Sequence, residues 1–474
     1  MTLNPSTITQ RGCIHDSFVA TLNCPRDQNV APGYIRLFET QLMFNSPIAP
    51  NTITLVAAFL SIHAAMASAD ELKSQPFPQA TGKKGLQVQM VDDAIALGIH
   101  HAGININLTA LLQLQHRDNT IRFRHKDREW LINGDYAKSL DRQIQPLSEA
   151  KIIVYAILLA YPSRDPARDA IMLHPKASGE FTIAGFNTAS EEGLHAYRAI
   201  IAFLAERYSG HHPEAGRVWG WIVGNEVNSQ KIWYNLGQMP MVEAASEYEK
   251  AVRATHDSVR EYSDHGRCYL SFDHFWTARM PGVSDQESYP TLDFLNEFAR
   301  VARQRGDFEW HVAHHPYPDD LGNPRTWLDK LATRTPDSPH ITFKNLEVLC
   351  ESLQSPELLW QEKPRRIILS EQGLHCLQTE DGETLQAAGF AYVWEKVARQ
   401  PGIDALIWHR HVDHAHEGGL RLGLWTNKPG TISEPDHPRH LYELFRKADT
   451  PAWPEAAAFA LPIVGLKQWS TIDE

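Results

Sequence analysis

The feature that most constrains the fold of this chain is a regular alternation of short apolar segments with longer amphipathic ones. From residue 85 onward, runs rich in Val, Ile and Leu alternate with segments whose apolar residues recur every three or four positions. The first pattern predicts buried β-strands, and the second predicts helices with one buried face. Eight strands are expected, at residues 85–89, 101–108, 151–159, 218–224, 268–272, 308–313, 366–369 and 403–408.

Strands that are apolar along their whole length and are separated by helices are typical of a parallel sheet covered on both faces. Eight such units favour a closed barrel over an open sheet, and the glycine-rich phosphate-binding turns of many open sheets are missing from the sequence. We therefore predict an α/β protein with a (β/α)8 TIM barrel over residues 81–474. A hairpin is expected at residues 120–133. Residues 1–80 predict a small β-rich N-terminal segment packed on the barrel.

Two glutamates follow predicted strands at the point where the apolar pattern stops. Glu226 ends the stretch WGWIVGNE at strand four, and Glu371 ends RIILSE at strand seven. An unpaired carboxylate is costly to bury, so this placement favours function, although a salt-bridged residue at the barrel mouth is the structural alternative. The carboxyl ends of barrel strands carry the active site. Two carboxyl groups in a partly dry pocket can serve as acid and nucleophile in glycoside hydrolysis.

An Asn-Glu pair at strand four with a glutamate at strand seven resembles the retaining (β/α)8 glycoside hydrolases of clan A. The chain is also similar to a family of uncharacterised bacterial glycosidase-like barrels in that group, over residues 81–474. The resemblance implies that Glu226 is the general acid/base, that Glu371 is the nucleophile, and that Asn225 holds the sugar 2-hydroxyl. It implies an oligosaccharide or polysaccharide substrate, cleaved at an equatorial β-D-glycosidic bond or its α-L-arabinoside equivalent, and no cofactor.

His315 and Tyr317 follow strand six and fit a His-x-Tyr element that is frequent in that clan. The resemblance implies that the Tyr317 hydroxyl holds the carboxylate of Glu371. A turn aromatic between two prolines is the structural alternative for this tyrosine.

Strands five and eight also end in polar and aromatic residues. His274 and Trp276 follow strand five, and strand eight ends at Trp408, three residues before His411. We expect all four to bind substrate. The resemblance implies that Trp408 is the floor under the reactive sugar, whereas barrel packing is its structural alternative.

Histidines support a competing interpretation. The chain has 24 His, and four of them share one loop with Asp413, at positions 409, 411, 414 and 416. Metal-dependent barrel hydrolases use these ligand types at strand ends. Such barrels usually carry His-x-His on strand one, where this chain has GLQVQ, so we expect no metal. The first alternative to a glycoside hydrolase, ahead of the metal-dependent one, is a carbohydrate-binding barrel without turnover, which assays on aryl glycosides would distinguish.

The overall charge limits the partners. A net charge of −12 argues against nucleic acid and anionic membranes, which both require a basic face. Five widely spaced cysteines without a CxxC pair argue against a disulfide framework. The first residues lack the basic and apolar regions of a signal peptide, so a cytoplasmic location is expected. The apolar run at 52–69 would instead indicate a periplasmic or secreted protein if it were the core of a signal.

Overall fold

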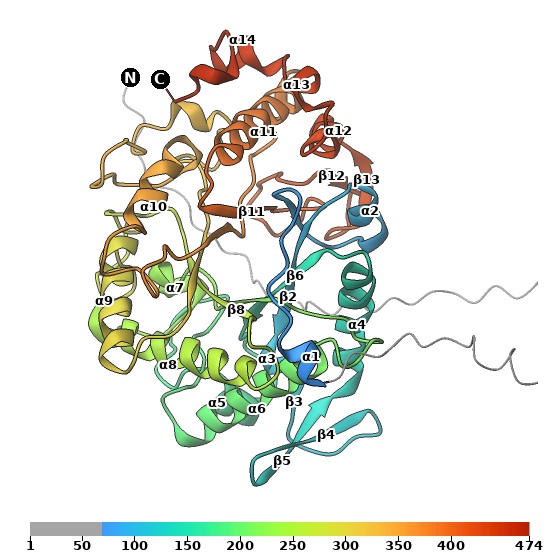
Figure 1. Cartoon of the computed structure of the whole chain (residues 1–474), viewed down its shortest axis with the longest axis vertical. Helices are drawn as coiled ribbons and strands as arrows, with labels where there is room; N and C mark the ends of the chain where they lie inside the picture. Colours follow the sequence, from blue (N-terminus) through green and yellow to red (C-terminus); the bar gives the residue numbers. More distant parts are fainter. Residues whose placement is uncertain (1–68, 474) are drawn as a thin grey trace, which may run out of the picture. The chain divides into compact units, whose positions relative to one another are not determined.

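A computed structural model of the protein describes residues 69–473, and eight parallel strands close into a barrel within them (Figure 1). The predicted (β/α)8 barrel is therefore confirmed, with each predicted strand present to within three residues at either end. Around the barrel, in order, the strands are β1 (Lys84–Gln87), β2 (His101–Asn107), β6 (Ile153–Leu159), β7 (Gly220–Val223), β8 (Arg267–Phe272), β9 (His311–His314), β10 (Ile367–Leu369) and β11 (Ile403–Trp408), which pairs with β1.

Helices cover the outside of the barrel (Figure 1). Their starts are set by local chemistry: the Ser190 hydroxyl accepts from the Gly193 N–H at the start of α6, as capping residues do. The helix that begins at Leu346 ends at Ser352, because Pro356 disfavours a helical residue before it. The main helices are α2 (Val91–Ala96), α4 (Gly134–Glu149), α6 (Glu191–Arg207), α8 (Met241–Arg260), α9 (Thr291–Gln304), α10 (Leu346–Ser352), α11 (Gly382–Ala398) and α12 (His440–Lys447).

Shorter elements fill the connections. The predicted hairpin is present as β4 (Thr120–His125) and β5 (Arg128–Asn133), and it projects beyond the helices in Figure 1. A second hairpin, β12 (Trp425–Asn427) with β13 (Pro435–Pro438), follows β11. The remaining elements are α1 (Ala69–Lys73), α3 (Leu108–Leu111), β3 (Leu112–Gln113), α5 (Pro166–Met172), η1 (Val227–Ser229), α7 (Gln230–Trp233), η2 (Thr326–Leu328), η3 (Phe343–Asn345), α13 (Trp453–Ala456), α14 (Ala460–Val464) and η4 (Trp469–Thr471).

The expected N-terminal segment lies mostly outside the described residues. Its described part, residues 69–80, contains the helix α1 and continues to the amino-terminal end of the barrel. There the ring of Phe77 packs edge-on against Trp219, at 5.9 Å between centroids. The apolar run at 52–69 also falls outside, apart from its last residue. No helix in the described part is long and apolar enough to cross a membrane.

Side chains alternate between the inside of the barrel and the helical layer, as the period of a strand requires. Tyr155 on β6 and Tyr269 on β8 point inward and pack edge-on, at 5.8 Å between centroids. Gly220 on β7 leaves room for the Tyr155 ring, because a Cβ atom there would lie 2.1 Å from the ring carbon Cδ1. These rings fill the lower barrel, so a site can form only above them, at the carboxyl ends of the strands.

Candidate active site

Glu226 is placed by the turn that follows β7. Gly224 adopts a φ of 77°, where a side chain would contact the Tyr234 ring, and Glu226 itself has a φ of 42°. A left-handed conformation is unfavourable for a residue with a side chain, and such strain concentrates at functional sites. The Ser271 hydroxyl on β8 accepts from the Glu226 N–H at 3.0 Å and helps to hold this conformation. The Glu226 carboxyl thereby lies at the barrel mouth, only 8% exposed.

Glu371 approaches from the opposite side of the mouth, two residues after the end of β10. Its side chain is partly exposed, and the Tyr317 hydroxyl donates to its Oε1 at 3.4 Å. One carboxylate oxygen of Glu371 lies within 4.8 Å of one of Glu226. Strands four and seven of the barrel are not neighbours, so both side chains reach inward to meet.

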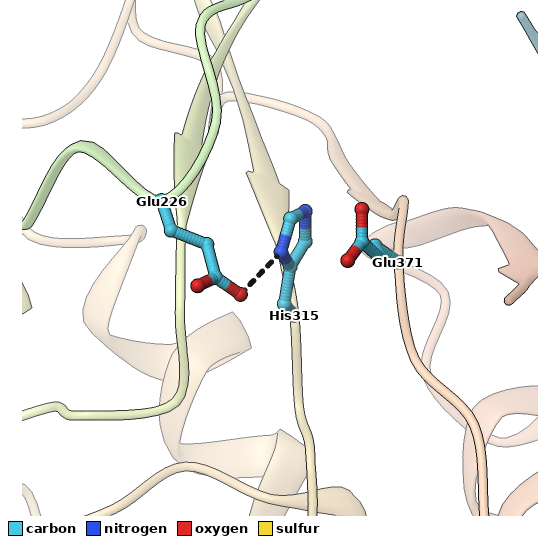
Figure 2. A group of neighbouring side chains, drawn as sticks. All are labelled: Glu226, His315 and Glu371. Atoms are coloured by element: carbon cyan, nitrogen blue, oxygen red, sulfur yellow. Dashed lines mark hydrogen bonds and ion pairs between the residues drawn. The ribbon is translucent and has the colours of Figure 1, made fainter. Parts of the chain in front are cut away.

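His315 lies between the two carboxyl groups (Figure 2). Its Nδ1 is 2.9 Å from Oε1 of Glu226, and its Nε2 is 3.0 Å from the Ser370 hydroxyl, next to Glu371. Burial lowers the pKa of His315, but the hydrogen bond to Glu226 and the negative charge of Glu371 outweigh it, so that the pKa is raised overall. The geometry thus favours an imidazolium that balances part of the negative charge of the mouth.

Behind Glu226 lies a second buried carboxyl group, that of Asp273 at the end of β8. Asp273 accepts hydrogen bonds from Asn228 Nδ2 at 2.5 Å, from the Ser229 hydroxyl and from a backbone N–H. Burial and the nearby charge of Glu226 raise the pKa of Asp273, although these hydrogen bonds oppose the shift. Asp273 ties η1, the turn that follows Glu226, to β8 and so fixes the position of Glu226.

Two tyrosines surround Glu371. Burial raises the pKa of Tyr317 well above its ordinary value, and the carboxylate of Glu371 raises it further. Tyr161, which follows β6, shows a raised pKa with the same two causes, so its hydroxyl also lies near Glu371. Both phenols therefore stay neutral and can act as hydrogen-bond donors.

The structure contradicts the predicted substrate-binding role of two tryptophans, because both side chains are fully buried. Trp408 is fully buried, packs at right angles to Phe390 of α11 at 5.2 Å between centroids, and donates from Nε1 to Leu422 O. Because Ile407 points into the barrel, the alternation of β11 turns Trp408 outward into the helical layer. Trp276 is likewise fully buried and donates from Nε1 to Pro336 O. Neither ring can stack on a sugar.

The predicted substrate-binding role of His411 is also wrong. It is fully buried, its Nε2 lies 2.8 Å from Asp93 Oδ2, and its Nδ1 accepts from the backbone N–H groups of Gln89 and Met90. Both ring nitrogens are thus engaged in joining the loop after β11 to the start of α2, and none is left for substrate.

His274 and Asn225 remain predicted binding residues. His274 is partly exposed and packs against the ring of Phe275, at 4.3 Å, and edge-on against the ring of His340, at 4.9 Å between centroids. Burial lowers the pKa of His274 to about 3, so the ring is neutral. Asn225 directly precedes Glu226 and is 7% exposed.

One group in the described part of the chain has metal-ligand geometry: Glu226, His315 and Glu371, each offering an atom within 4.8 Å of the others. The histidines of the loop at 409–416, suspected from the sequence, do not form such a group within residues 69–473. His409 contacts Gln87 and Glu417, whereas His411 contacts Asp93.

The sequence did not predict Tyr161, Gln87 and Glu417 as residues of the mouth. Tyr161 and Trp233 are partly exposed and pack against the cluster inside the barrel. Gln87, at the end of β1, and His409, directly after β11, both face the inside of the barrel mouth. The inward direction of Gln87 could have been predicted, because it lies two residues after the inward Gly85 on the first strand. Tyr161 and Glu417 come from loops, where no period predicts the direction of a side chain.

Comparisons with known proteins agree with the fold. The family described as "Family of unknown function (DUF5722)" matches residues 76–472. Curated proteins give no match. A solved β-glucosidase mutant, derived from a hyperthermophilic tetrameric structure, is similar with a TM-score of 0.51 and 16% identity, over 79% of this chain and 86% of that one. This likeness concerns the fold.

Two further solved structures have slightly lower similarity. A hyperthermophilic β-glucosidase from Pyrococcus furiosus has a TM-score of 0.49 and 14% identity, over 79% of this chain and 86% of that one. A family 39 glycoside hydrolase from the gut symbiont Bacteroides cellulosilyticus WH2 has a TM-score of 0.49 and 12% identity, over 80% of this chain. The present chain spans 64% of the length of that family 39 protein.

Proposed function

Because the chain belongs to DUF5722, a family of unknown function, its activity must be inferred from its own residues, and we propose that it is a retaining glycoside hydrolase. The observation that carries this proposal is the approach of the Glu226 and Glu371 carboxylate oxygens to within 4.8 Å across the barrel mouth. Retaining enzymes hold their carboxyl groups about 5–5.5 Å apart, whereas inverting enzymes need about 6.5–9.5 Å to fit a water molecule.

In the first step, a carboxylate oxygen of Glu371 attacks the anomeric carbon while Glu226 gives its proton to the leaving glycosidic oxygen. The bond from carbon to Glu371 forms as the bond to the leaving group breaks, which gives a covalent glycosyl ester. The Tyr317 hydroxyl, 3.4 Å from Glu371 Oε1, holds the attacking carboxylate in position.

In the second step, Glu226 acts as a base. It takes a proton from a water molecule, the water oxygen attacks the anomeric carbon, and the ester bond to Glu371 breaks, so the configuration is retained. His315, hydrogen-bonded to Glu226 at 2.9 Å, stabilises the carboxylate form that this step requires. No cofactor takes part in either step.

We propose an O-glycosidic bond of an oligosaccharide or polysaccharide as the target, with β-D-glycosides and α-L-arabinosides as the first substrates to test. The resemblance to clan A supports this choice, as does the shared fold of the β-glucosidase mutant. We propose that Asn225, which directly precedes Glu226, binds the sugar 2-hydroxyl.

The test is chemical rescue of Glu371→Gly on 2,4-dinitrophenyl glycosides of glucose, galactose, xylose and arabinose. The variant should lose at least about 1,000-fold in kcat, because the covalent route is closed, and azide should restore part of it. The product from a β-linked substrate should be the α-glycosyl azide.

A matched control is Glu380→Gly, which removes an exposed glutamate from the loop that follows Glu371 and should leave kcat unchanged. A β-glycosyl azide, in which the configuration is retained, would show that Glu371 is the acid/base and Glu226 the nucleophile. A wild-type protein that binds these sugars without cleaving any would instead establish the carbohydrate-binding barrel.

A further inference from the structure

A polar cluster lies at the mouth where β11 closes the barrel against β1. The register pairs Gly85 with Ile407, both inward, and Leu86 with Trp408, so Gln87 and His409 follow as neighbours on the inner side. Their side chains meet there, with His409 Nδ1 2.5 Å from Gln87 Oε1. Polar side chains directed into the mouth of a packed barrel lie where a ligand binds in this fold.

Glu417, from the loop after β11, completes the cluster. Its Oε1 lies 3.1 Å from His409 Nε2, and its Oε2 accepts from the guanidinium of Arg410. Burial would raise the pKa of Glu417, but these two partners lower it to about 2, so the group is an ionised carboxylate at neutral pH. The Glu417 side chain is 23% exposed, so a ligand can reach it.

The cluster adjoins the candidate nucleophile. The His409 N–H donates to Gln372 O at 2.9 Å, one residue beyond Glu371. The charge of Glu417 also contributes to the raised pKa of Tyr317, the tyrosine that donates to Glu371. A sugar ring whose anomeric carbon is at Glu371 would therefore meet these side chains with its other carbon atoms.

We propose that Gln87, His409 and Glu417 bind ring hydroxyls of the sugar unit that Glu371 attacks, and that this sugar is neutral. This inference rests on the proposed function and specifies its substrate. A carboxylate has about four acceptor positions, and His409 and Arg410 occupy one on each oxygen, so Glu417 can accept from two neighbouring hydroxyls.

The charges at the mouth explain why the sugar is neutral. The charges of Glu226, Glu371 and Glu417 all act on Tyr317, so the three carboxyl groups lie near one another, and Asp273 is buried close to Glu226. Arg410 is already paired with Glu417. A uronate would add a further carboxylate to this group of acidic side chains, and like charges at this range repel.

The experiment is a thermodynamic cycle in which a side chain of the protein and a hydroxyl of the sugar are removed separately and together. Calorimetry measures the binding of each combination, so that the result does not depend on turnover. Wild type, Glu417→Gln and the matched control Glu434→Gln are titrated with the methyl β-glycosides of glucose, galactose and xylose and with methyl β-glucuronide. The control removes a carboxylate of the turn between β12 and β13 that is 65% exposed and forms an ion pair with Lys428. The neutral sugar that binds most tightly is then tested as its 3-deoxy, 4-deoxy and, for a hexose, 6-deoxy derivatives.

In wild type and Glu434→Gln, at least one deoxygenation should weaken binding by about 10- to 100-fold, since a hydrogen bond to a charged group is lost. In Glu417→Gln the intact sugar should bind about 10- to 100-fold more weakly, and the same deoxygenation should then change Kd less than about 3-fold. Equal losses in all three proteins, tighter binding of the glucuronide, or no binding of any neutral glycoside would each overturn the inference. Circular dichroism and melting of Glu417→Gln check that the variant is folded, and Gln87→Ala gives a second variant for the same cycle.

This outcome is separable from that of the proposed function. A binding cycle as expected, with no azide rescue and no hydrolysis, would leave the sugar pocket intact and refute only the glycosidase. Hydrolysis and rescue without the binding cycle would refute only the role of Glu417.

Discussion

His315 Nδ1 lies 2.9 Å from Oε1 of Glu226, and the imidazole is 2% exposed. The other ring nitrogen contacts Ser370, beside Glu371, so a single buried ring spans the distance between the two carboxyl groups. In an apolar interior, two carboxylates so close together would repel strongly. His315 reduces that repulsion, and the mouth can hold one group ready to attack and another ready to exchange a proton.

This contact predicts a pH-dependent contribution of His315 to stability. Its pKa is raised in the folded protein, so the stabilisation is full below the unfolded value of about 6.5 and is lost as the pH rises through the folded value. The difference in unfolding free energy between wild type and His315→Gln should therefore shrink from pH 5.5 to pH 9. Urea unfolding at four pH values measures it. A difference that grows with pH would contradict the assignment.

His314 should have the opposite effect. Burial lowers its pKa to about 3, and its Nε2–H donates to Ile341 O at 3.0 Å. The unfolded chain takes up this proton near pH 6.5 and the folded chain does not, so stability falls as the pH drops. At pH 5 the loss relative to pH 8 should be about 2 kcal/mol for this group. His314→Gln, which keeps a donor, should show a correspondingly smaller acid destabilisation in urea titrations.

Tyr317→Phe should lower kcat by about 10- to 100-fold, because the hydroxyl that holds the Glu371 carboxylate is lost. KM should change less than kcat, since the ring still fills its place. Steady-state kinetics on a dinitrophenyl glycoside measures both constants. An unchanged kcat would show that the hydrogen bond does not position the nucleophile.

Trp408→Phe should lower stability and leave catalysis unchanged. The ring is fully buried against Phe390, and the substitution removes volume and the donor to Leu422 O, at a cost of about 1–3 kcal/mol. Trp233→Ala, at a partly exposed position of the mouth, serves as the comparison and should instead raise KM. A large rise in KM for Trp408→Phe would restore its predicted stacking role.

Treatment with EDTA should leave activity unchanged. Glu226, His315 and Glu371 are close enough to share an ion, but His315 already bonds to Glu226 and to Ser370, and each carboxylate has a proposed role in the double displacement. Metal analysis of the purified protein, before and after EDTA, checks this. One equivalent of zinc or manganese per chain, lost and regained together with activity, would favour a metal-dependent hydrolase over the two-glutamate mechanism.

The sequence alone determined the barrel and the carboxylate pair. Strand and helix periods are local properties, and eight alternations leave few closed arrangements, so every barrel strand was placed to within three residues. Glu226 and Glu371 could be predicted to share one side because the carboxyl ends of parallel strands lie together. The contact of Tyr317 with Glu371 follows from the same rule and from the resemblance.

Only the tertiary structure decided which way the side chains point near the strand ends. Trp408 and His409 are adjacent in sequence, yet Trp408 packs against α11 while His409 faces the mouth, because successive side chains alternate across a strand. If the alternation were shifted by one residue, the side chains that face the helical layer would face the mouth instead, and the reverse. Composition alone does not determine which of the two arrangements occurs. Glu417 reaches the mouth from a loop without any period, so its place beside His409 depends on contacts between segments far apart in the chain.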